Sequence, residues 1–253
     1  MERDGYSRKF AAAVTAASSV VGPIIPPSII MVIYAFMMNV SVAGLFAAGV
    51  VPGLLVGLAL MAVTAIISKR RNYPKTEKRA PIGEVAQSAK NAALPLLTPV
   101  IIIGGITGGV FTPTEAASIA AFYALILSLF VLKTLKPSEL PQIFLHAAVS
   151  SGAILLVVGT ATAFAWIATL SQVPIKLSTL LFSISDNPYM LLFLINVLLL
   201  FVGMFLDAGP AILILGPILA PTMVQLGVHP LHFAIIMCVN LTVGLATPPM
   251  GLI

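Results

Sequence analysis

Two copies of one glycine–proline motif give this sequence its clearest potential for ion chemistry. Gly-x-x-x-Pro-Pro occurs at residues 22–27 and again at 244–249, each time after a valine. Consecutive prolines remove two backbone donors from a helix, and the glycine lets the chain turn away. Carbonyl oxygens freed there can bind a cation, while the half-helix that follows presents its N-terminal dipole to an anion. For either motif alone, a plain proline kink is the alternative interpretation.

Asp207 is the second candidate, because it is the only acidic residue after Asp186. A carboxylate near the middle of a bilayer costs about 2.5–3.5 kcal/mol on insertion scales, so it usually has a partner or a function. If residues 189–226 form a re-entrant hairpin, Asp207 lies near the second motif, where it can assist a cation site or cap a half-helix. If those residues cross the membrane twice, Asp207 is a loop residue in water.

Hydroxyl groups beside the two motifs are weaker candidates. They suit contacts with a cation or a carboxylate, although many membrane hydroxyls only bond their own helix. These residues are Ser18, Ser19, Thr242 and Thr247. The single cysteine, Cys238, excludes a cysteine-based metal site, and we expect no transition-metal site. An intramembrane protease needs a second aspartate near Asp207 or a Ser–His pair within the spans. Asp207 is alone and the histidines lie at interfaces, so we expect no enzyme.

Composition places these residues in a lipid bilayer. Of the 253 residues, 59% are apolar and only 8% are charged, whereas a soluble domain carries about 25% charged residues. The net charge of +5 does not indicate a nucleic-acid partner, because seven of the thirteen basic residues fall in one polar insert at 69–90 between apolar spans. The sequence therefore predicts an all-α integral membrane protein.

The basic residues also indicate how the spans are oriented. If the 69–90 loop is cytoplasmic and each span reverses the side, the inside segments 1–9, 69–90 and 133–141 hold twelve of the thirteen basic residues. Only Lys176 lies outside. The first motif then lies on a helix that runs outward, and the second on a helix that runs inward. Two copies in opposite orientation are what an inverted-topology repeat predicts.

We expect three regions along the chain. Residues 1–50 end a first inverted repeat, with a broken helix over 10–37. Residues 51–93 hold a scaffold helix and the basic cytoplasmic loop. Residues 94–253 form a second inverted repeat, with spans at 94–110, 114–132 and 149–170, a hairpin at 189–226 and a broken helix at 231–253. Both ends look cut, because the last residues belong to an apolar run, so we expect a fragment whose bundle is incomplete at both ends.

The hairpin has an alternative that the charges do not separate. Residues 189–226 are long enough for two spans, and either arrangement returns the chain to the same side. Gly203, Gly209 and Pro210 crowd the turn, which carries no basic residue. These features favour a re-entrant hairpin.

At these motifs the sequence resembles the large membrane subunit of tripartite ATP-independent periplasmic (TRAP) transporters. The matching stretches are residues 17–28, 111–117, 203–207 and 240–251. The resemblance implies an elevator-type, inverted-repeat sodium symporter of the bacterial inner membrane. It further implies a small TRAP membrane subunit and a periplasmic substrate-binding protein that delivers an organic acid, often a C4-dicarboxylate or sialic acid. No cofactor is implied beyond Na⁺ as the coupling ion.

The resemblance also implies where the ligands bind. In this family, sodium sits between a hairpin tip and a broken helix. Carried over to this sequence, the expected cation-binding residues are Gly22, Ile25, Pro26, Gly203, Asp207, Gly244 and Thr247. The expected substrate-binding residues are Ser18, Ser19, Pro27, Ser28, Ala208, Thr242 and Pro248. The hairpin of the first repeat is expected before Met1.

Two other functions remain open at this point. A proton-coupled carrier, or a carrier of a non-carboxylate anion, is possible on the same fold. A channel is disfavoured, because a charged-ring filter needs more charged residues between the spans than this sequence has.

Overall fold

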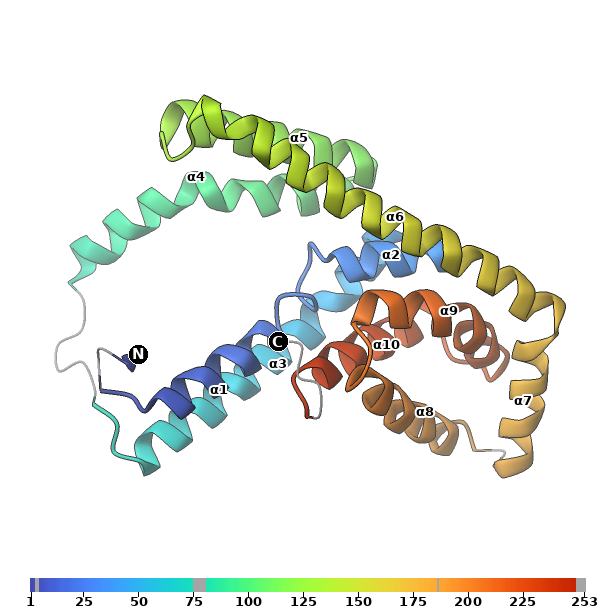
Figure 1. Cartoon of the computed structure of the whole chain (residues 1–253). Coiled ribbons are helices and arrows are strands. Elements are labelled where there is room, and N and C mark those ends of the chain that lie inside the picture. The colour runs from blue at the N-terminus through green and yellow to red at the C-terminus, as the bar shows by residue number, and fades with distance from the viewer. Residues whose placement is uncertain (3–4, 75–80, 186, 249–253) are drawn as a thin grey trace.

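The computed structural model describes residues 1–2, 5–74, 81–185 and 187–248, and within them the fold is all-α with no β-strand (Figure 1). The described part contains five helices that are long and apolar enough to cross a membrane. They are Val42–Arg70, Ile82–Thr107, Pro113–Val131, Pro137–Leu170 and Ala208–Gln225. The expected all-α membrane fold is confirmed.

The first Gly-x-x-x-Pro-Pro motif lies in a gap between two short helices. Helix α1 (Arg8–Ser19) ends before the motif, and α2 (Ile29–Met38) begins after it. Residues 20–28 contain three prolines. Because proline has no backbone N–H to donate to a helical ladder, the helix cannot continue through this segment.

Helix α3 (Val42–Arg70) is longer than the sequence indicated. It begins nine residues before the expected scaffold helix, where Ser41 caps it by accepting a hydrogen bond from Gly44 N at 3.1 Å. Pro52 lies inside the helix without ending it, because a single proline deprives only one carbonyl of its donor. The expected division between residues 50 and 51 therefore falls inside a helix.

Helix α4 (Ile82–Thr107) and helix α5 (Pro113–Ile126), which continues into a π-helical turn at Leu127–Val131, pack side by side. The expected span 94–110 begins within α4 and extends three residues beyond the end of that helix at Thr107. The Tyr123 hydroxyl donates to the Leu94 carbonyl at 2.9 Å and ties the two helices together. The start of α5 is fixed by a capping box, in which Glu115 Oε2 accepts from Thr112 N at 2.8 Å.

A 3₁₀ turn (Pro137–Glu139) leads into α6 (Leu140–Leu170), and α7 (Val173–Ile184) follows after a sharp turn. Helix α6 has 31 residues, which corresponds to about 46 Å. It is longer than the expected span 149–170 because no proline or glycine interrupts the stretch between Gln142 and Ser151.

The last three helices contain most of the core. They are α8 (Pro188–Gly203), α9 (Ala208–Gln225) and α10 (Pro230–Leu245). Helix α10 packs on α8 and α9, while α9 also packs on α2, α6 and α7. Fully buried side chains fill the space between them, including Phe233, Met237 and Leu241 of α10 and Ile212 and Met223 of α9. The segment 189–226 is thus two helices joined by a short turn.

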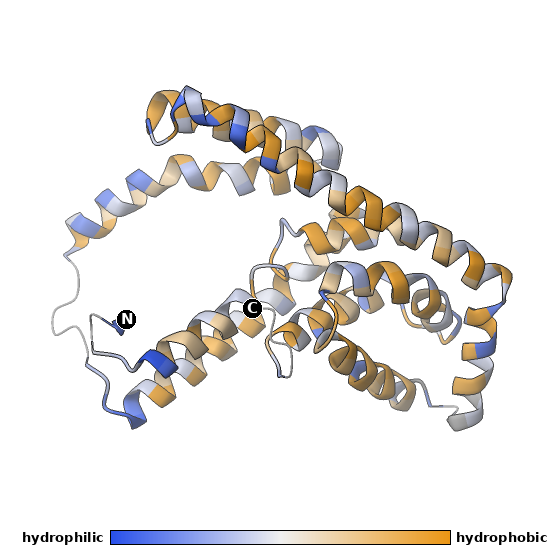
Figure 2. Cartoon of the chain, viewed as in Figure 1, coloured by the Kyte–Doolittle hydropathy of each residue, from blue (hydrophilic) through white to orange (hydrophobic). Residues whose placement is uncertain are grey.

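Hydrophilic residues gather at one side of the molecule. The start of α1, the end of α3, the start of α4 and the connection from α5 to α6 all lie at the left of the view in Figure 2. The first two are in contact, because Ser7 Oγ and Tyr73 Oη lie 2.7 Å apart and the Arg71 guanidinium is 5.9 Å from the centre of the Phe10 ring. These are the segments that the charge pattern assigns to the cytoplasm.

Candidate functional site

The ends of α8 and α10 meet backbone to backbone. A Cβ atom built on Gly244 would lie 2.6 Å from Gly203 Cα and 2.9 Å from the carbonyl oxygen of Leu200. A Cβ atom on Gly203 would lie 2.7 Å from the carbonyl oxygen of Leu241. Because these neighbours are backbone atoms, neither position can accept a side chain unless the helices move apart. We call this contact the glycine seam, and it places the α8–α9 turn beside the end of α10 (Figure 1).

Asp207 is the residue that precedes α9, and it caps that helix. Its Oδ1 accepts a hydrogen bond from Ala208 N at 2.8 Å, and its backbone has the extended conformation of an N-cap, with φ −60° and ψ 146°. The side chain is exposed, and within the described part of the chain it has no cationic partner. Asp207 therefore holds a negative charge at the positive end of the α9 dipole, with oxygen lone pairs open to a cation.

The second motif leaves carbonyl groups near the glycine seam without their usual donors. In a helix, the carbonyls of Gly244 and Leu245 would accept from the N–H groups four residues later. Those residues are Pro248 and Pro249, which have no N–H to donate. Thr247 compensates for one of them, because its N and its Oγ1 donate to Gly244 O at 2.9 and 2.6 Å. Helix α10 ends here. The rest of the expected broken helix, residues 249–253, lies outside the described residues.

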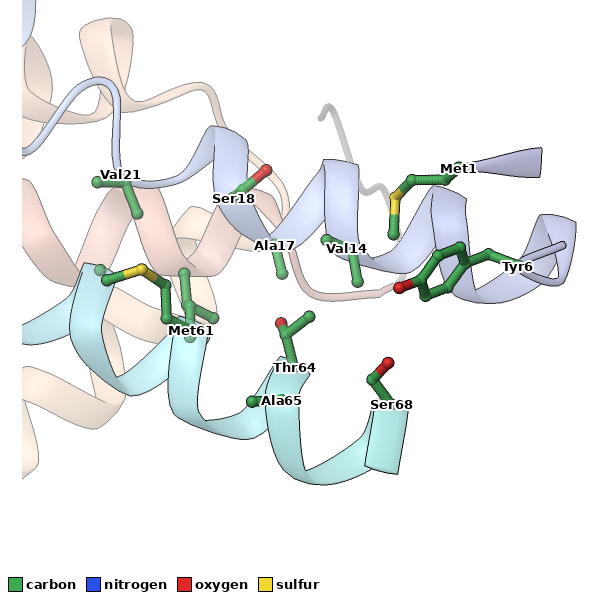
Figure 3. Close-up of a pocket in the computed structure, with 12 residues that line it drawn as sticks. Met1, Tyr6, Val14, Ala17, Ser18, Val21, Met61, Thr64, Ala65 and Ser68 are labelled. Atoms are coloured by element: carbon green, nitrogen blue, oxygen red, sulfur yellow. The ribbon is translucent and has the colours of Figure 1, made fainter. Parts of the chain in front are cut away.

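Three of the expected substrate-binding hydroxyls bond their own helices. Thr242 is fully buried and donates to the carbonyl of Cys238. Ser18 and Ser19 are exposed and donate to carbonyls three residues earlier, at 3.0 and 2.7 Å. Figure 3 shows the Ser18 hydroxyl pointing away from α3, whereas its neighbour Ala17 points into the groove between α1 and α3. These hydroxyls are therefore already satisfied within their helices.

Ser28 is the hydroxyl that closes the first break. Its Oγ donates to the carbonyl of Pro23 at 2.5 Å and accepts from Met31 N at 3.3 Å, so it caps α2 and holds the loop back against it. The residue is only 3% exposed. Pro26 beside it is buried, while Gly22 and Pro27 are exposed.

We expect Ser28→Ala to lower the free energy of unfolding by about 1–2 kcal/mol, because it removes a helix cap and leaves a carbonyl oxygen without its donor. Thermal unfolding of the purified protein in detergent measures this change. Ser18→Ala is the matched control, and it should stay within about 0.5 kcal/mol of the wild type. Equal losses for the two variants would show that Ser28 has no special part in the break.

Two glycines of α3 support the first break, although their types and positions in the sequence did not mark them as candidates. A Cβ atom on Gly49 would lie 3.2 Å from the Ile24 carbonyl oxygen, and one on Gly53 would lie 2.6 Å from a side-chain carbon of Ile25. The signal that could have revealed them is their Gly-x-x-x-Gly spacing, which allows close helix packing in membranes.

The Asp207 turn and the second half of the first broken helix line a common cavity of about 300 Å³. Three sides contribute to it: α2 through Ile29, Ile30 and Ile33, α6 through Ala153, Ile154 and Val157, and the start of α9 through Asp207, Gly209 and Pro210. Apart from Asp207, these side chains are apolar. The volume is at the lower end of the range that small-molecule sites occupy.

The predicted site residues thus fall into two groups. Gly203, Asp207, Ala208, Gly244 and Thr247 surround the glycine seam and the turn after it. The remaining cation candidates, Gly22, Ile25 and Pro26, lie in the first break, where Ile25 packs against α3. Ser28 connects the groups, because it caps the helix whose first residues line the cavity with Asp207.

Comparison with known proteins shows one family. The family model described as tripartite ATP-independent periplasmic transporter, DctM component, matches residues 1–253. The chain is 44% identical over 250 residues to the sialic acid TRAP transporter large permease protein SiaM of Vibrio cholerae, covering 98% of this chain and 58% of the relative. It is 41% identical over 252 residues to the C4-dicarboxylate TRAP transporter large permease protein DctM of Pseudomonas aeruginosa, covering 100% of this chain and 59% of the relative.

A third relative has a different substrate in its name. It is the isethionate TRAP transporter permease protein DctMQ of Oleidesulfovibrio alaskensis, which is 41% identical over 251 residues, covering 99% of this chain and 40% of the relative. The chain therefore spans less than two thirds of the length of the relatives that it matches.

Proposed function

The chain belongs to the DctM component family of tripartite ATP-independent periplasmic transporters, and from this premise we propose that it is part of a permease that imports an organic acid together with sodium. The permease lies in the bacterial inner membrane. By analogy with the named relatives, the substrate is an organic anion of the sialic acid or C4-dicarboxylate type. The resemblance adds two partners to the proposal, a small membrane subunit and a periplasmic binding protein.

The observation that carries the proposal is the glycine seam with Asp207 next to it. The seam joins a hairpin turn to a helix end whose carbonyls have lost donors, and Asp207 adds a carboxylate without a cationic partner among the described residues. Backbone carbonyls and a carboxylate are hard oxygen ligands, which suit an alkali cation.

The charge of Asp207 gives a reason for coupling the two ligands. Asp207 lines the cavity between α2, α6 and α9, and an organic anion that entered this cavity would be repelled by the carboxylate. A sodium ion bound at the Asp207 turn removes that repulsion. Binding of the anion then depends on prior binding of the cation, which is the thermodynamic basis of symport.

The length of α8, the first arm of the segment 189–226, favours a re-entrant hairpin. Helix α8 has 16 residues, about 24 Å, which is shorter than the bilayer core of about 30 Å, whereas the second arm, α9, has 18 residues, about 27 Å. In the proposed arrangement the turn at residues 204–207 stays near mid-membrane and does not cross to the other side. The unit of α2 and α8–α10 moves as one body past the scaffold pair α4 and α5, in an elevator-type movement. Helix α4 packs mainly on α5 and α3 rather than on that unit.

We expect the intact permease, reconstituted with its partner proteins in liposomes, to accumulate the organic acid under an inward sodium gradient. A proton gradient in sodium-free buffer should give no uptake above background. Uptake of a radiolabelled acid, with sialic acid and succinate as the first probes, measures the difference. Equal uptake under the two gradients would favour the alternative, a proton-coupled carrier of the same family.

A further inference from the structure

Two asparagine side chains join α8 to α10 beside the apolar core. Asn240 Nδ2 donates to Asn196 Oδ1 at 2.6 Å, and both residues are partly buried. The neighbouring positions on these helices are apolar, with Ile195 and Leu199 on α8 and Leu241 on α10 buried. A polar pair in such surroundings has to compensate for its desolvation through its hydrogen bonds.

The direction of this hydrogen bond is fixed by the two helix backbones. Asn196 Nδ2 donates to the carbonyl of Leu192 at 2.7 Å, and Asn240 Nδ2 donates to the carbonyl of Ile236 at 2.7 Å. A carbonyl oxygen can only accept a hydrogen bond, so these two bonds show which atom of each side-chain amide is the nitrogen. Asn196 must therefore present its oxygen to α10, and Asn240 is the donor between the helices.

The asparagine pair and the glycine seam lie on the same face between α8 and α10. Asn196 is seven residues before Gly203, which is close to two helical turns, and Asn240 is four residues before Gly244, which is about one turn. If α8 shifted by one residue along α10, it would move by about 1.5 Å, and the side chain of Val202 or Met204 would take the place of Gly203 at the Gly244 backbone. The close approach of the two backbones at the glycine seam is therefore possible in only one register of the two helices.

We propose that Asn196 and Asn240 are positioning residues that fix this register and thereby hold the Asp207 turn in place to bind sodium. Small residues allow two helices to approach closely, but contacts between apolar side chains do not by themselves select one register over another. A single polar pair does, because any other register breaks the hydrogen bond between Asn240 and Asn196. The inference rests on the proposed sodium site, which the pair does not touch.

The test replaces the pair with leucines, singly and together, in the intact permease. Each single variant leaves the other asparagine without its partner across the two helices, whereas Asn196→Leu/Asn240→Leu gives an apolar contact and should unfold near the wild-type temperature. We nevertheless expect the double variant to need about threefold to tenfold more sodium for half-maximal uptake, because the hydrogen bond that holds the helices in the register of the glycine seam is then lost. A purely structural pair would leave the sodium requirement of the stable double variant unchanged, which would overturn the proposal.

Hydrogen–deuterium exchange tests the register without relying on sodium. In sodium-free buffer, the amides of residues 203–207 should exchange faster in the double variant than in the wild type. Asn91→Leu is the matched control, because Asn91 also accepts an amide hydrogen bond, from Gln87 at 3.2 Å, but on an exposed face of α4. Exchange that is equal in the double variant and the wild type would overturn the proposal. If uptake by the wild type does not depend on sodium, the proposed function is contradicted, but the exchange experiment still tests the register.

A pair of aspartate variants tests the direction of the hydrogen bond. Asn196→Asp keeps the oxygen that accepts from Asn240, whereas Asn240→Asp removes the donor, and both add the same charge at the same depth. We expect Asn240→Asp to accelerate exchange at residues 203–207 and to raise the sodium requirement more than Asn196→Asp does. Equal effects would contradict the assigned donor and acceptor.

Discussion

Gly244→Val is expected to reduce sodium-driven uptake about 100-fold, because the glycine seam has no room for a side chain. A Cβ atom at this position would lie 2.6 Å from Gly203 Cα and 2.7 Å from Gly203 C. These are backbone atoms, which cannot rotate away as the end of a flexible side chain can. Overpacking of this kind costs about 1–3 kcal/mol, and about 2.7 kcal/mol is equivalent to about 100-fold. Initial uptake rates in proteoliposomes at a fixed sodium gradient measure the loss.

The same substitution at Gly159 is the matched control. Gly159 lies in α6, and a Cβ atom there would meet nothing within 4 Å, so Gly159→Val should retain most of the uptake. Gly203→Val should behave like Gly244→Val, since the two glycines face each other. Near-normal uptake by either seam variant, with normal amounts of protein in the membrane, would show that the close approach of α8 and α10 is not needed for transport.

Asp207→Asn is expected to raise the sodium concentration for half-maximal uptake by about tenfold or more, while uptake at saturating sodium falls much less. Asparagine is as good an N-cap as aspartate, so α9 should keep its start and the protein its stability. What the variant loses is the negative charge, and a polar contact to a charged group is worth about 1.5–3 kcal/mol. A sodium titration of uptake at constant ionic strength gives the midpoint.

Two further variants separate charge from capping at Asp207. Asp207→Ala removes both, so it should share the shifted sodium midpoint and also unfold at a lower temperature. Glu139→Gln removes a charge from another capping carboxylate, which accepts from Lys136 N at 3.1 Å far along the chain from the seam, and should leave the midpoint unchanged. If Asp207→Asn and Glu139→Gln have the same midpoint, Asp207 does not bind the cation.

Proline chemistry explains why the broken regions of this fold were predictable. Pro23, Pro26 and Pro27 remove three backbone donors within five residues, and the sequence pair Pro248–Pro249 removes two donors just after the end of α10. An isolated proline has a weaker effect, because the helix loses only one backbone hydrogen bond and the neighbouring ones remain. Pro52 in α3 and Pro95 in α4 accordingly lie inside continuous helices.

Helix boundaries were less predictable, because polarity does not end a helix by itself. The segment 82–93 of α4 contains charged residues and was expected to lie outside the span, but no breaker separates it from the span. The same holds for the start of α6, where His146 lies within one helix with the following apolar residues. In both cases, the sequence defines the apolar part of a helix more reliably than the ends of that helix.

The candidate site was predictable where a residue has chemistry of its own. Asp207 is a solitary carboxylate in an apolar stretch, and the structure places it at the turn beside the second motif. Gly49, Gly53 and Asn196 were not predictable in this way, because their importance depends on which helix faces them. An asparagine in an apolar helix indicates a polar contact, but only the packing of α8 on α10 identifies Asn240 as the partner.

Direct binding of radioactive sodium to the purified, intact permease tests the central claim, that the glycine seam and Asp207 form a cation site. The wild type should bind sodium saturably without substrate, and Gly244→Val and Asp207→Asn should each lose a class of bound sodium that Gly159→Val and Glu139→Gln retain. If the two site variants bind sodium with the same stoichiometry and affinity as the wild type, the cation does not bind at this turn, and sodium does not couple to the organic anion through Asp207.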